Sequence, residues 1–175
     1  MKMLKKLLAV VLTGAMALTL LTACGSNAVN DKSIADALND MAKGSLATYT
    51  FKSRTDEQAM AKAIAALSES DRHTTGGKAS EKVMKILKLD KGGANEESRF
   101  VWWGAVFADE IGTAGQAYNV MDKILSQKAA NADKLTGKKP GDIRYIGTAL
   151  GTLTIHGKPT TVRFIVVTAE PVDKK

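Results

Sequence analysis

Cysteine is almost absent from this chain of 175 residues, because Cys24 is its one cysteine. A single thiol cannot form an internal disulfide, so the sequence excludes a disulfide-stapled scaffold and leaves stability to packing. Histidine is also scarce, with His73 and His156 as the two copies. A catalytic zinc usually takes about three protein ligands, so neither histidine indicates a zinc enzyme by itself.

Catalytic signatures are also missing from the sequence. Beyond residue 24 there is no Gly-x-Ser-x-Gly elbow, no His-Glu-x-x-His pair, no P-loop and no Gly-x-Gly-x-x-Gly turn. Aromatic residues make up 5% of the chain and are not interleaved with a basic stripe, as they are in nucleic-acid grooves. The sequence therefore predicts no cofactor and no nucleic-acid partner.

The first 23 residues have the layout of a secretory signal peptide. Lys2, Lys5 and Lys6 precede an apolar run over residues 7–21, and small residues follow it. The run is shorter than the roughly 20 apolar residues that cross a bilayer, and two threonines and a glycine dilute it. A permanent transmembrane anchor is therefore the weaker interpretation.

The residues Leu-Thr-Ala-Cys at 21–24 resemble the lipobox of bacterial lipoproteins. In that family the cysteine receives a diacylglyceryl group and the peptide before it is cleaved. The resemblance implies that Cys24 is the lipidation site and the first residue of the mature protein. The alternative is a free cysteine in an ordinary signal peptide. Two acyl chains are enough for stable anchoring, so we expect an extracytoplasmic protein held on the cell membrane by lipid.

Cleavage after residue 23 would leave 152 residues, which fits one domain with one substantial core. The formal charge falls from +7 to +4, because the leader holds three lysines and no acid. We expect a lipidated tether over residues 24–30 and a single domain over residues 31–172. The remaining positive charge suits an anionic phospholipid or wall polymer, and a merely solvated basic surface is the competing interpretation.

Apolar periodicity and capping residues predict four helices in the domain. They are expected over residues 32–43 with Asp31 as the cap, from a Thr55 and Gln58 capping box to about residue 67, over 81–89 after Ser80, and over 114–131.

Strand composition is concentrated in the second half of the domain. Residues 99–108 form a near-continuous apolar run, which predicts a strand buried on both faces, with a short buried helix as the alternative. Residues 48–51 predict an edge strand or an extended loop. After a polar surface loop at 131–142, two strands at 143–155 and 160–169 predict a hairpin. The fold class is therefore α+β, with helices around a small, largely antiparallel sheet.

Glycines in the first hairpin strand predict unusual packing there. Gly147 and Gly151 lie within a strand pattern, where glycine marks a bulge or a close approach of two backbones.

This order of elements, with particular residues, resembles the CAP superfamily of cysteine-rich secretory, antigen 5 and pathogenesis-related 1 proteins. The matching features are an asparagine-bearing first helix at 37–39, an alanine-rich second helix at 56–63, a histidine loop at 73–78 and an Ile-Gly-x-Ala strand at 146–149. The resemblance covers about residues 31–170 and implies an α-β-α sandwich that ends in a C-terminal hairpin.

The resemblance also implies a site that this chain has lost. Cavities of the family commonly carry two histidines and two acids that can hold a divalent metal. In this chain only one of these four positions is matched, by His73. Residues 100–108 contain no acid and residues 125–129 contain no histidine. We therefore expect a non-catalytic binding or interaction module without a metal.

The candidate ligand pocket consists of His73, Trp102 and Trp103. The competing interpretation is a polar loop histidine beside core tryptophans, since adjacent strand residues point to opposite faces. Lys138, Lys139 and Arg144 are candidates for contact with an anionic wall polymer or lipid headgroups, against the alternative of an ordinary basic loop.

Two other functions stay open. One is a cell-envelope hydrolase that uses His73 and a nearby carboxylate, and the other is a small accessory or inhibitor lipoprotein with an unrelated α+β fold. The expected partners are membrane lipid through Cys24 and either an anionic wall polymer or another envelope protein.

Overall fold

A computed structural model of the chain describes residues 29–45, 48–73, 78–89, 99–108 and 111–174. Its helices are α2 (Asp31–Gly44), α3 (Thr55–Ala66), α4 (Glu69–Arg72), α5 (Glu81–Ile86) and α6 (Thr113–Val120), with the π-helical turn η2 (Met121–Leu125) and the 3-10 turn η3 (Ala132–Lys134). Its strands are β1 (Thr50–Ser53), β2 (Phe100–Phe107), β3 (Lys138–Ile155) and β4 (Lys158–Asp173). Among these residues, no helix is long and apolar enough to cross a membrane.

The strands form one mixed sheet in the order β1-β3-β4-β2. The β3 and β4 strands make a long antiparallel hairpin, β2 is antiparallel to β4, and β1 is parallel to β3. The hairpin turns at His156 and Gly157, whose φ angles of 51° and 76° suit a two-residue type I′ turn. The predicted C-terminal hairpin is confirmed.

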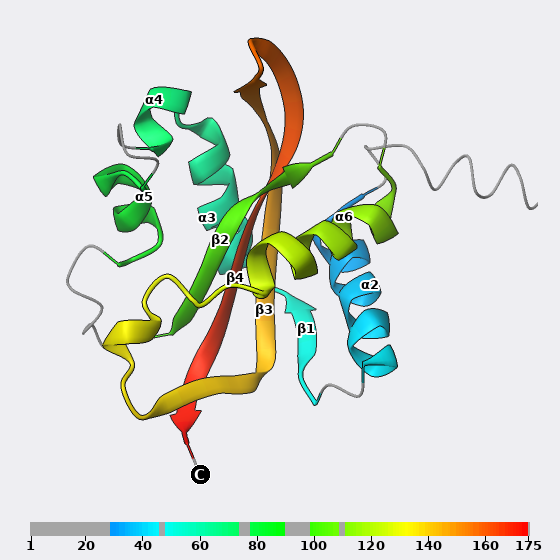
Figure 1. Cartoon of the computed structure of the whole chain (residues 1–175), viewed down its shortest axis with the longest axis vertical. Coiled ribbons are helices and arrows are strands. Elements are labelled where there is room, and N and C mark those ends of the chain that lie inside the picture. Colours follow the sequence, from blue (N-terminus) through cyan, green and yellow to red (C-terminus); the bar gives the residue numbers. More distant parts are fainter. Residues whose placement is uncertain (1–28, 46–47, 74–77, 90–98, 109–110, 175) are drawn as a thin grey trace, which may run out of the picture.

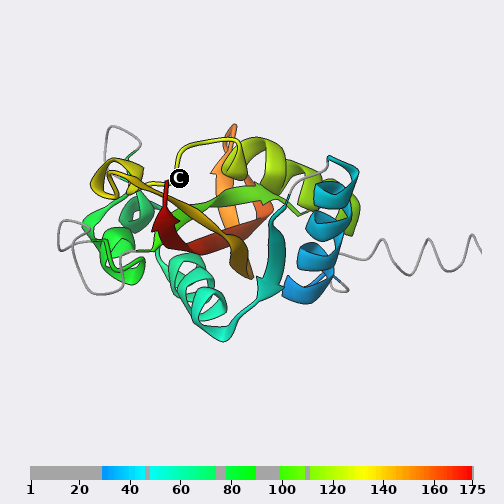
Figure 2. The same cartoon turned by 90° about the horizontal axis from the view of Figure 1, so that it is seen from below.

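Helices cover both faces of this sheet. On one face α2, α6 and η2 pack on a core that includes Trp102, Ile146 and Ile165. On the other face α3 and α5 pack on a core that includes Phe164 and Val166. Figure 1 shows α2 beside β1, and Figure 2, turned by 90°, shows α6 and α3 on opposite sides of the sheet. The predicted α+β fold, with helices on both sides of a mostly antiparallel sheet, is confirmed.

The apolar run at 99–108 is the strand β2, and both of its faces are covered as predicted. It lies at an edge of the sheet, and a later segment caps part of that edge. Val101 N donates to Asn131 Oδ1 (3.1 Å), Asn131 Nδ2 donates to Arg99 O (2.6 Å), and Ala130 N donates to Val101 O (2.7 Å). The prediction of a helix over 114–131 is therefore wrong at its end, because residues 130 and 131 bond to β2 after η2 stops at Leu125.

The start of the domain differs from the prediction in one residue. Asn30, not Asp31, caps α2, in a capping box in which Asn30 Oδ1 accepts from Ser33 N (3.0 Å) and Ser33 Oγ accepts from Asn30 N (2.9 Å). Asp31 is buried instead and accepts a hydrogen bond from Thr148 N (3.0 Å). Val29 is buried too, so the folded body already includes residues that the sequence assigns to the tether.

Other helix boundaries shift for local reasons. The capping box predicted at Thr55 is wrong, because Thr55 is already helical and Arg54 is the N-cap without a side-chain bond. The Ser80 cap of α5 is confirmed, since its hydroxyl accepts from Val83 N (3.2 Å). The α5 helix ends at Ile86 rather than residue 89, and α4 occupies part of the predicted loop after α3.

The predicted surface loop at 131–142 is also partly wrong. Residues 138–140 belong to β3 and pair with residues 171–173 of β4, and the register shifts between Pro140 and Arg144. Pro140 lies opposite Pro171, and neither residue has an N–H to donate. The proline and glycine that indicate a loop thus mark an irregular position within a strand.

The close backbone approach predicted at Gly147 is confirmed. A Cβ placed there would lie 1.9 Å from Gln58 N and 2.1 Å from Glu57 C, so the first turn of α3 rests directly on β3. At Gly151 a Cβ would lie 2.8 Å from Cε2 of Phe164. Only glycine lets the helix and strand meet at the first of these positions.

Candidate functional site

The predicted pocket residues fall on two faces of the sheet. His73 and Trp103 lie together on the α3 face, where their rings stack with centroids 5.8 Å apart and an angle of 25° between planes. Trp102 lies on the α6 face, is 7% exposed, and its indole Nε1 donates to Gln127 O (2.9 Å). The three side chains therefore do not line one pocket, and Trp102 is a core residue, as expected for one of the two tryptophans.

The structure describes little of two other predicted sites, the lipidation site and the histidine loop. Cys24 lies outside the described residues, and so do residues 74–77 of the histidine loop. His73 itself is exposed and forms an isolated bridge with Ala79.

Arg144 occupies a small pocket on the α6 face of the sheet. Its guanidinium carbon lies 4.9 Å from the Trp102 ring centroid and 5.1 Å from the Tyr49 ring centroid. A pocket of about 130 Å³ opens here, lined by Tyr49, Phe51, Trp102, Leu125, Pro140 and Arg144. The two rings make favourable cation–π contacts with the guanidinium, but a ring cannot accept its N–H groups as a carboxylate does.

The guanidinium of Arg144 is incompletely satisfied. Its Nε is buried and has no hydrogen-bond partner among the described residues. Burial lowers the pKa of Arg144 from its ordinary value, yet an arginine stays charged in proteins. A buried donor without an acceptor costs about 1–3 kcal/mol, so an anion reaching this group would be stabilised.

Of the other four arginines of the chain, three donate from Nε to a protein acceptor. Arg163 donates to Gln116 Oε1 (2.7 Å), Thr148 Oγ1 (3.1 Å) and Val29 O (2.8 Å). Arg72 donates to three backbone carbonyls, those of Ile64, Ala65 and Thr152. Arg54 pairs with Glu57 and also lies 3.9 Å from the Tyr145 ring centroid.

The remaining arginine, Arg99, has a carboxylate partner. Its Nε lies 2.6 Å from Glu170 Oε1 in an ion pair whose angle does not meet hydrogen-bond geometry. Arg144 is thus the one arginine that faces two aromatic rings and pairs with no carboxylate among the described residues.

A second cavity of about 380 Å³ adjoins the Arg144 pocket, because Trp102 and Pro140 line both. We call the two cavities together the Arg144 groove. Asp133 is the one carboxylate among the described residues that line it. Its cationic lining residues are Arg144, Lys128, Lys138, Lys139 and Lys174. The groove runs between the segment that contains η3 and the first residues of β3, at the lower end of the sheet in Figure 1.

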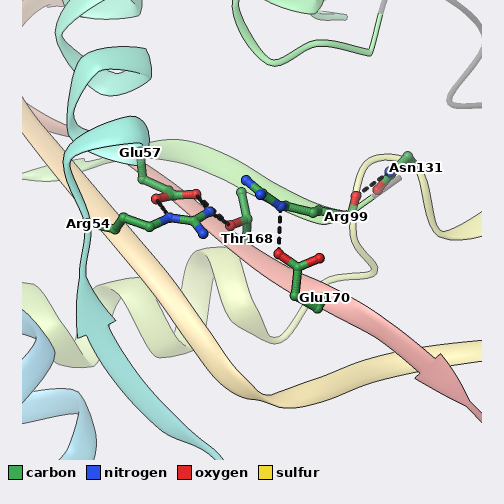
Figure 3. Close-up of polar contacts among 6 residues, drawn as sticks. All are labelled: Arg54, Glu57, Arg99, Asn131, Thr168 and Glu170. Carbon is green, nitrogen blue, oxygen red and sulfur yellow. Dashed lines mark hydrogen bonds and ion pairs between the residues drawn. The ribbon is translucent and has the colours of Figure 1, made fainter. Parts of the chain in front are cut away.

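A buried carboxylate lies on the opposite face, in the polar cluster of Figure 3. Glu57 is fully buried and accepts from Arg54 Nε (2.6 Å) and Thr168 Oγ1 (2.6 Å). Burial alone would raise the pKa of Glu57, but the hydrogen bonds from Arg54 and Thr168 and the charge of Arg54 hold it below its ordinary value. A carboxylate kept ionised in this way joins α3 to β4 and is not suited to act as a general acid.

The second buried network ties the start of the domain to the sheet. Arg163 and Thr148 bind Val29 and Asp31, and Gln116 of α6 accepts from Arg163 while donating to Ile111 O (2.9 Å). Each of the three guanidinium nitrogens of Arg163 donates to a protein acceptor, so this network has a structural role. Over the described ranges, no group of three or more His, Cys, Asp or Glu residues could hold a metal ion.

Comparison with protein-family models, with curated proteins and with solved structures found no match for this chain. The resemblance to the CAP superfamily therefore stays a prediction. The class defined by the fold and the site is an α+β sandwich with a basic, aromatic-lined groove at one end of its sheet.

The sequence indicated part of this groove. Lys138, Lys139 and Arg144 are candidates for anion contact on composition alone, but Tyr49 is not, because it precedes β1 and is far from Arg144 in sequence. Parallel pairing of Phe51 with Arg144 is what brings Tyr49 to the guanidinium. Without that pairing, the sequence did not indicate that Tyr49 contributes to the groove.

Proposed function

We propose that this protein is a lipid-anchored, extracytoplasmic binding module that recognises an anionic group at Arg144 and does not catalyse a reaction. The anchor part rests on the pattern at residues 21–24. The observation that carries the binding part is the half-buried guanidinium of Arg144, held between Trp102 and Tyr49 with an unpartnered Nε. An incoming carboxylate or phosphate would supply the missing acceptor.

The geometry around Arg144 supports binding rather than bond cleavage. Trp102 uses its indole N–H on Gln127 O, so the ring positions the guanidinium and offers no donor to a ligand. No histidine is among the described residues that line the groove. A bound anion would therefore be held by fixed charge, and Asp133 in the larger cavity is the one carboxylate among the described lining residues.

The competing hydrolase relies on His73, and its surroundings favour a different role. His73 stacks on Trp103 and lies on the face of the sheet opposite the groove. Glu57 is on that same face, but Arg54 and Thr168 already occupy its carboxylate. A hydrolase would still be indicated by metal-dependent turnover that His73→Ala abolishes.

The CAP-superfamily resemblance belongs to this proposal at the level of architecture. A layered α-β-α arrangement is what that resemblance implies, and layering by itself specifies no ligand. The binding role rests on Arg144 alone.

The anchor is tested by labelling cells with a radioactive fatty acid and fractionating them. Cys24 should incorporate the label and hold the protein in the membrane fraction, and Cys24→Ser should lose both properties. Ser26→Ala, two residues beyond the predicted modification site, is the matched control and should keep them. Normal processing and membrane retention of Cys24→Ser would contradict the proposal.

The binding role is tested with orthophosphate and acetate as probes on the full chain in neutral detergent. Trp102 contacts Arg144, so saturable changes in tryptophan fluorescence should report anion binding. Arg144→Gln should abolish the response, and Lys158→Gln at the hairpin tip should keep it. No response to either anion in the wild type would overturn the binding role.

A further inference from the structure

We infer that the ligand of the Arg144 groove is an extended polymer whose successive repeats carry phosphate, rather than a single anion or a lipid headgroup. This inference rests on the proposed function, since it names the ligand class of the same site. Three features of the described residues carry it: the length of the groove, its lysines, and its position relative to the start of the domain.

The groove is too long for one small anion. Arg144 and Lys138 are six residues apart on β3, which is roughly 20 Å at about 3.3 Å per residue, somewhat less because of the irregularity after Pro140. A phosphate contacts donors within about 3 Å of its oxygens, so one group cannot reach both ends. A chain of phosphates can occupy the pocket at Arg144 and continue past Pro140 along the lysines.

The lysines favour phosphate over a neutral ligand. Lys128, Lys138, Lys139 and Lys174 all line the larger cavity, and all four are exposed. Lys138 pairs with Asp173 at 2.6 Å, but both side chains are well exposed, at 44% and 83%, and such pairs are weak. Flexible ammonium groups suit phosphates at varied spacing, whereas the planar guanidinium of Arg144 suits one phosphate held in a fixed orientation.

The position of the groove favours a polymer as its ligand, rather than the headgroups of the membrane to which the protein is anchored. The described residues begin at Val29, whose carbonyl accepts from Arg163 beside Thr148 of β3. From Thr148 to Lys138 is ten residues of strand, roughly 30 Å. The surface potential of a membrane falls off within about 10 Å, so the potential of a membrane at the start of the domain would not reach the lysine end.

The test compares phosphates of different length on the full, acylated protein in neutral detergent. The probes are long-chain polyphosphate, orthophosphate and glycerophosphoglycerol, which is the headgroup of an anionic phospholipid without its acyl chains. Polyphosphate should bind at least about a hundredfold more tightly than either small probe, because several weak contacts act together. Its affinity should fall on the order of a hundredfold between about 0.05 and 0.2 M salt, as expected for about five neutralised phosphates.

Variants separate this site from general charge. Arg144→Gln should weaken polyphosphate binding by about tenfold or more, through loss of a charge-assisted contact. Lys158→Gln removes the same charge at the far end of the hairpin and should stay within about twofold of wild type. A double change of Lys138 and Lys139 to glutamine, at exposed positions, should reduce the slope of affinity against salt by about 1–2 and tests the site even if Arg144→Gln does not fold.

Three results would overturn the inference. The first is equal affinity for glycerophosphoglycerol and polyphosphate, which would indicate a headgroup site and leave the proposed binding role intact. The second is an equal loss of polyphosphate binding in Arg144→Gln and Lys158→Gln, which would indicate diffuse attraction. The third is no binding of any phosphate, which would remove the proposed binding role as well, while fatty-acid labelling of Cys24 would still decide the anchor.

Discussion

The close contact between α3 and β3 at Gly147 leads to the most specific prediction, which concerns the free energy of unfolding. Gly147→Ala would place a Cβ 1.9 Å from Gln58 N, whereas an ordinary contact is at least 3.4 Å, so the helix would have to move by about 1.5 Å. The obstructing atoms are backbone, which cannot rotate away as a side chain can. Such a shift would also pull Glu57 from Thr168. Overpacking typically costs about 1–3 kcal/mol, and we expect about 3 kcal/mol or more here.

Urea unfolding followed by tryptophan fluorescence measures this change, because both tryptophans lie in β2 within the folded domain. Gly44→Ala is the matched control, since a Cβ there meets nothing within 4 Å and the residue ends α2. The control should be neutral or stabilise the protein by about 0.4–1 kcal/mol. A Gly147→Ala variant whose unfolding free energy stays within about 0.5 kcal/mol of wild type would refute the seating of α3 on β3.

Two further predictions concern the buried networks. Glu57→Gln should lower the unfolding free energy at pH 7 by about 1–3 kcal/mol. This range allows for the weakening of the ion pair by solvent, because Arg54 is partly exposed. The pKa of Glu57 is lowered in the folded state, so its stabilising effect is present above the unfolded-state pKa and is lost as the pH falls through the folded pKa. Urea titrations at pH 7 and near pH 3 should therefore show the gap between wild type and variant closing in acid, and a constant gap would contradict the assignment. Arg163→Met should lower the unfolding free energy by about 2–4 kcal/mol, because it leaves the buried acceptors of Gln116 and Val29 unpaired. Thermal unfolding by circular dichroism measures it, and an unchanged midpoint would show that the network does not stabilise the start of the domain.

Patterns local to a few residues were predictable from the sequence. The β-branched and aromatic composition of 143–169, with turn residues at 156–159, predicted the hairpin, and the Ser80 cap followed from side-chain chemistry within one helical turn. Gly147 was recognisable as a close approach because glycine within a strand is otherwise unfavourable. The α+β class followed from the order of these elements.

Elsewhere, predictions from local patterns were wrong because long-range hydrogen bonds determine the structure. Asn131 and Ala130 leave the helical pattern because the free edge of β2 needs donors and acceptors, which no local pattern reports. The sequence predicts a loop at 138–140, but these residues pair with 171–173. Asp31 was predicted to cap the first helix, but it accepts a hydrogen bond from Thr148. In each case a hydrogen bond to a partner at least 29 residues away outweighs a local preference worth about 1 kcal/mol or less.

By itself, the sequence determined the chemistry available to this protein: one cysteine in a lipobox-like pattern, two histidines, no internal disulfide, and a hairpin between helices. The tertiary structure alone decided which side chains share a site. It brought Tyr49 to Arg144 through the parallel pairing of β1 with β3, and it placed His73 against Trp103 rather than Trp102. The half-buried charge that results depends on residues about 95 positions apart, and only folding sets such distances.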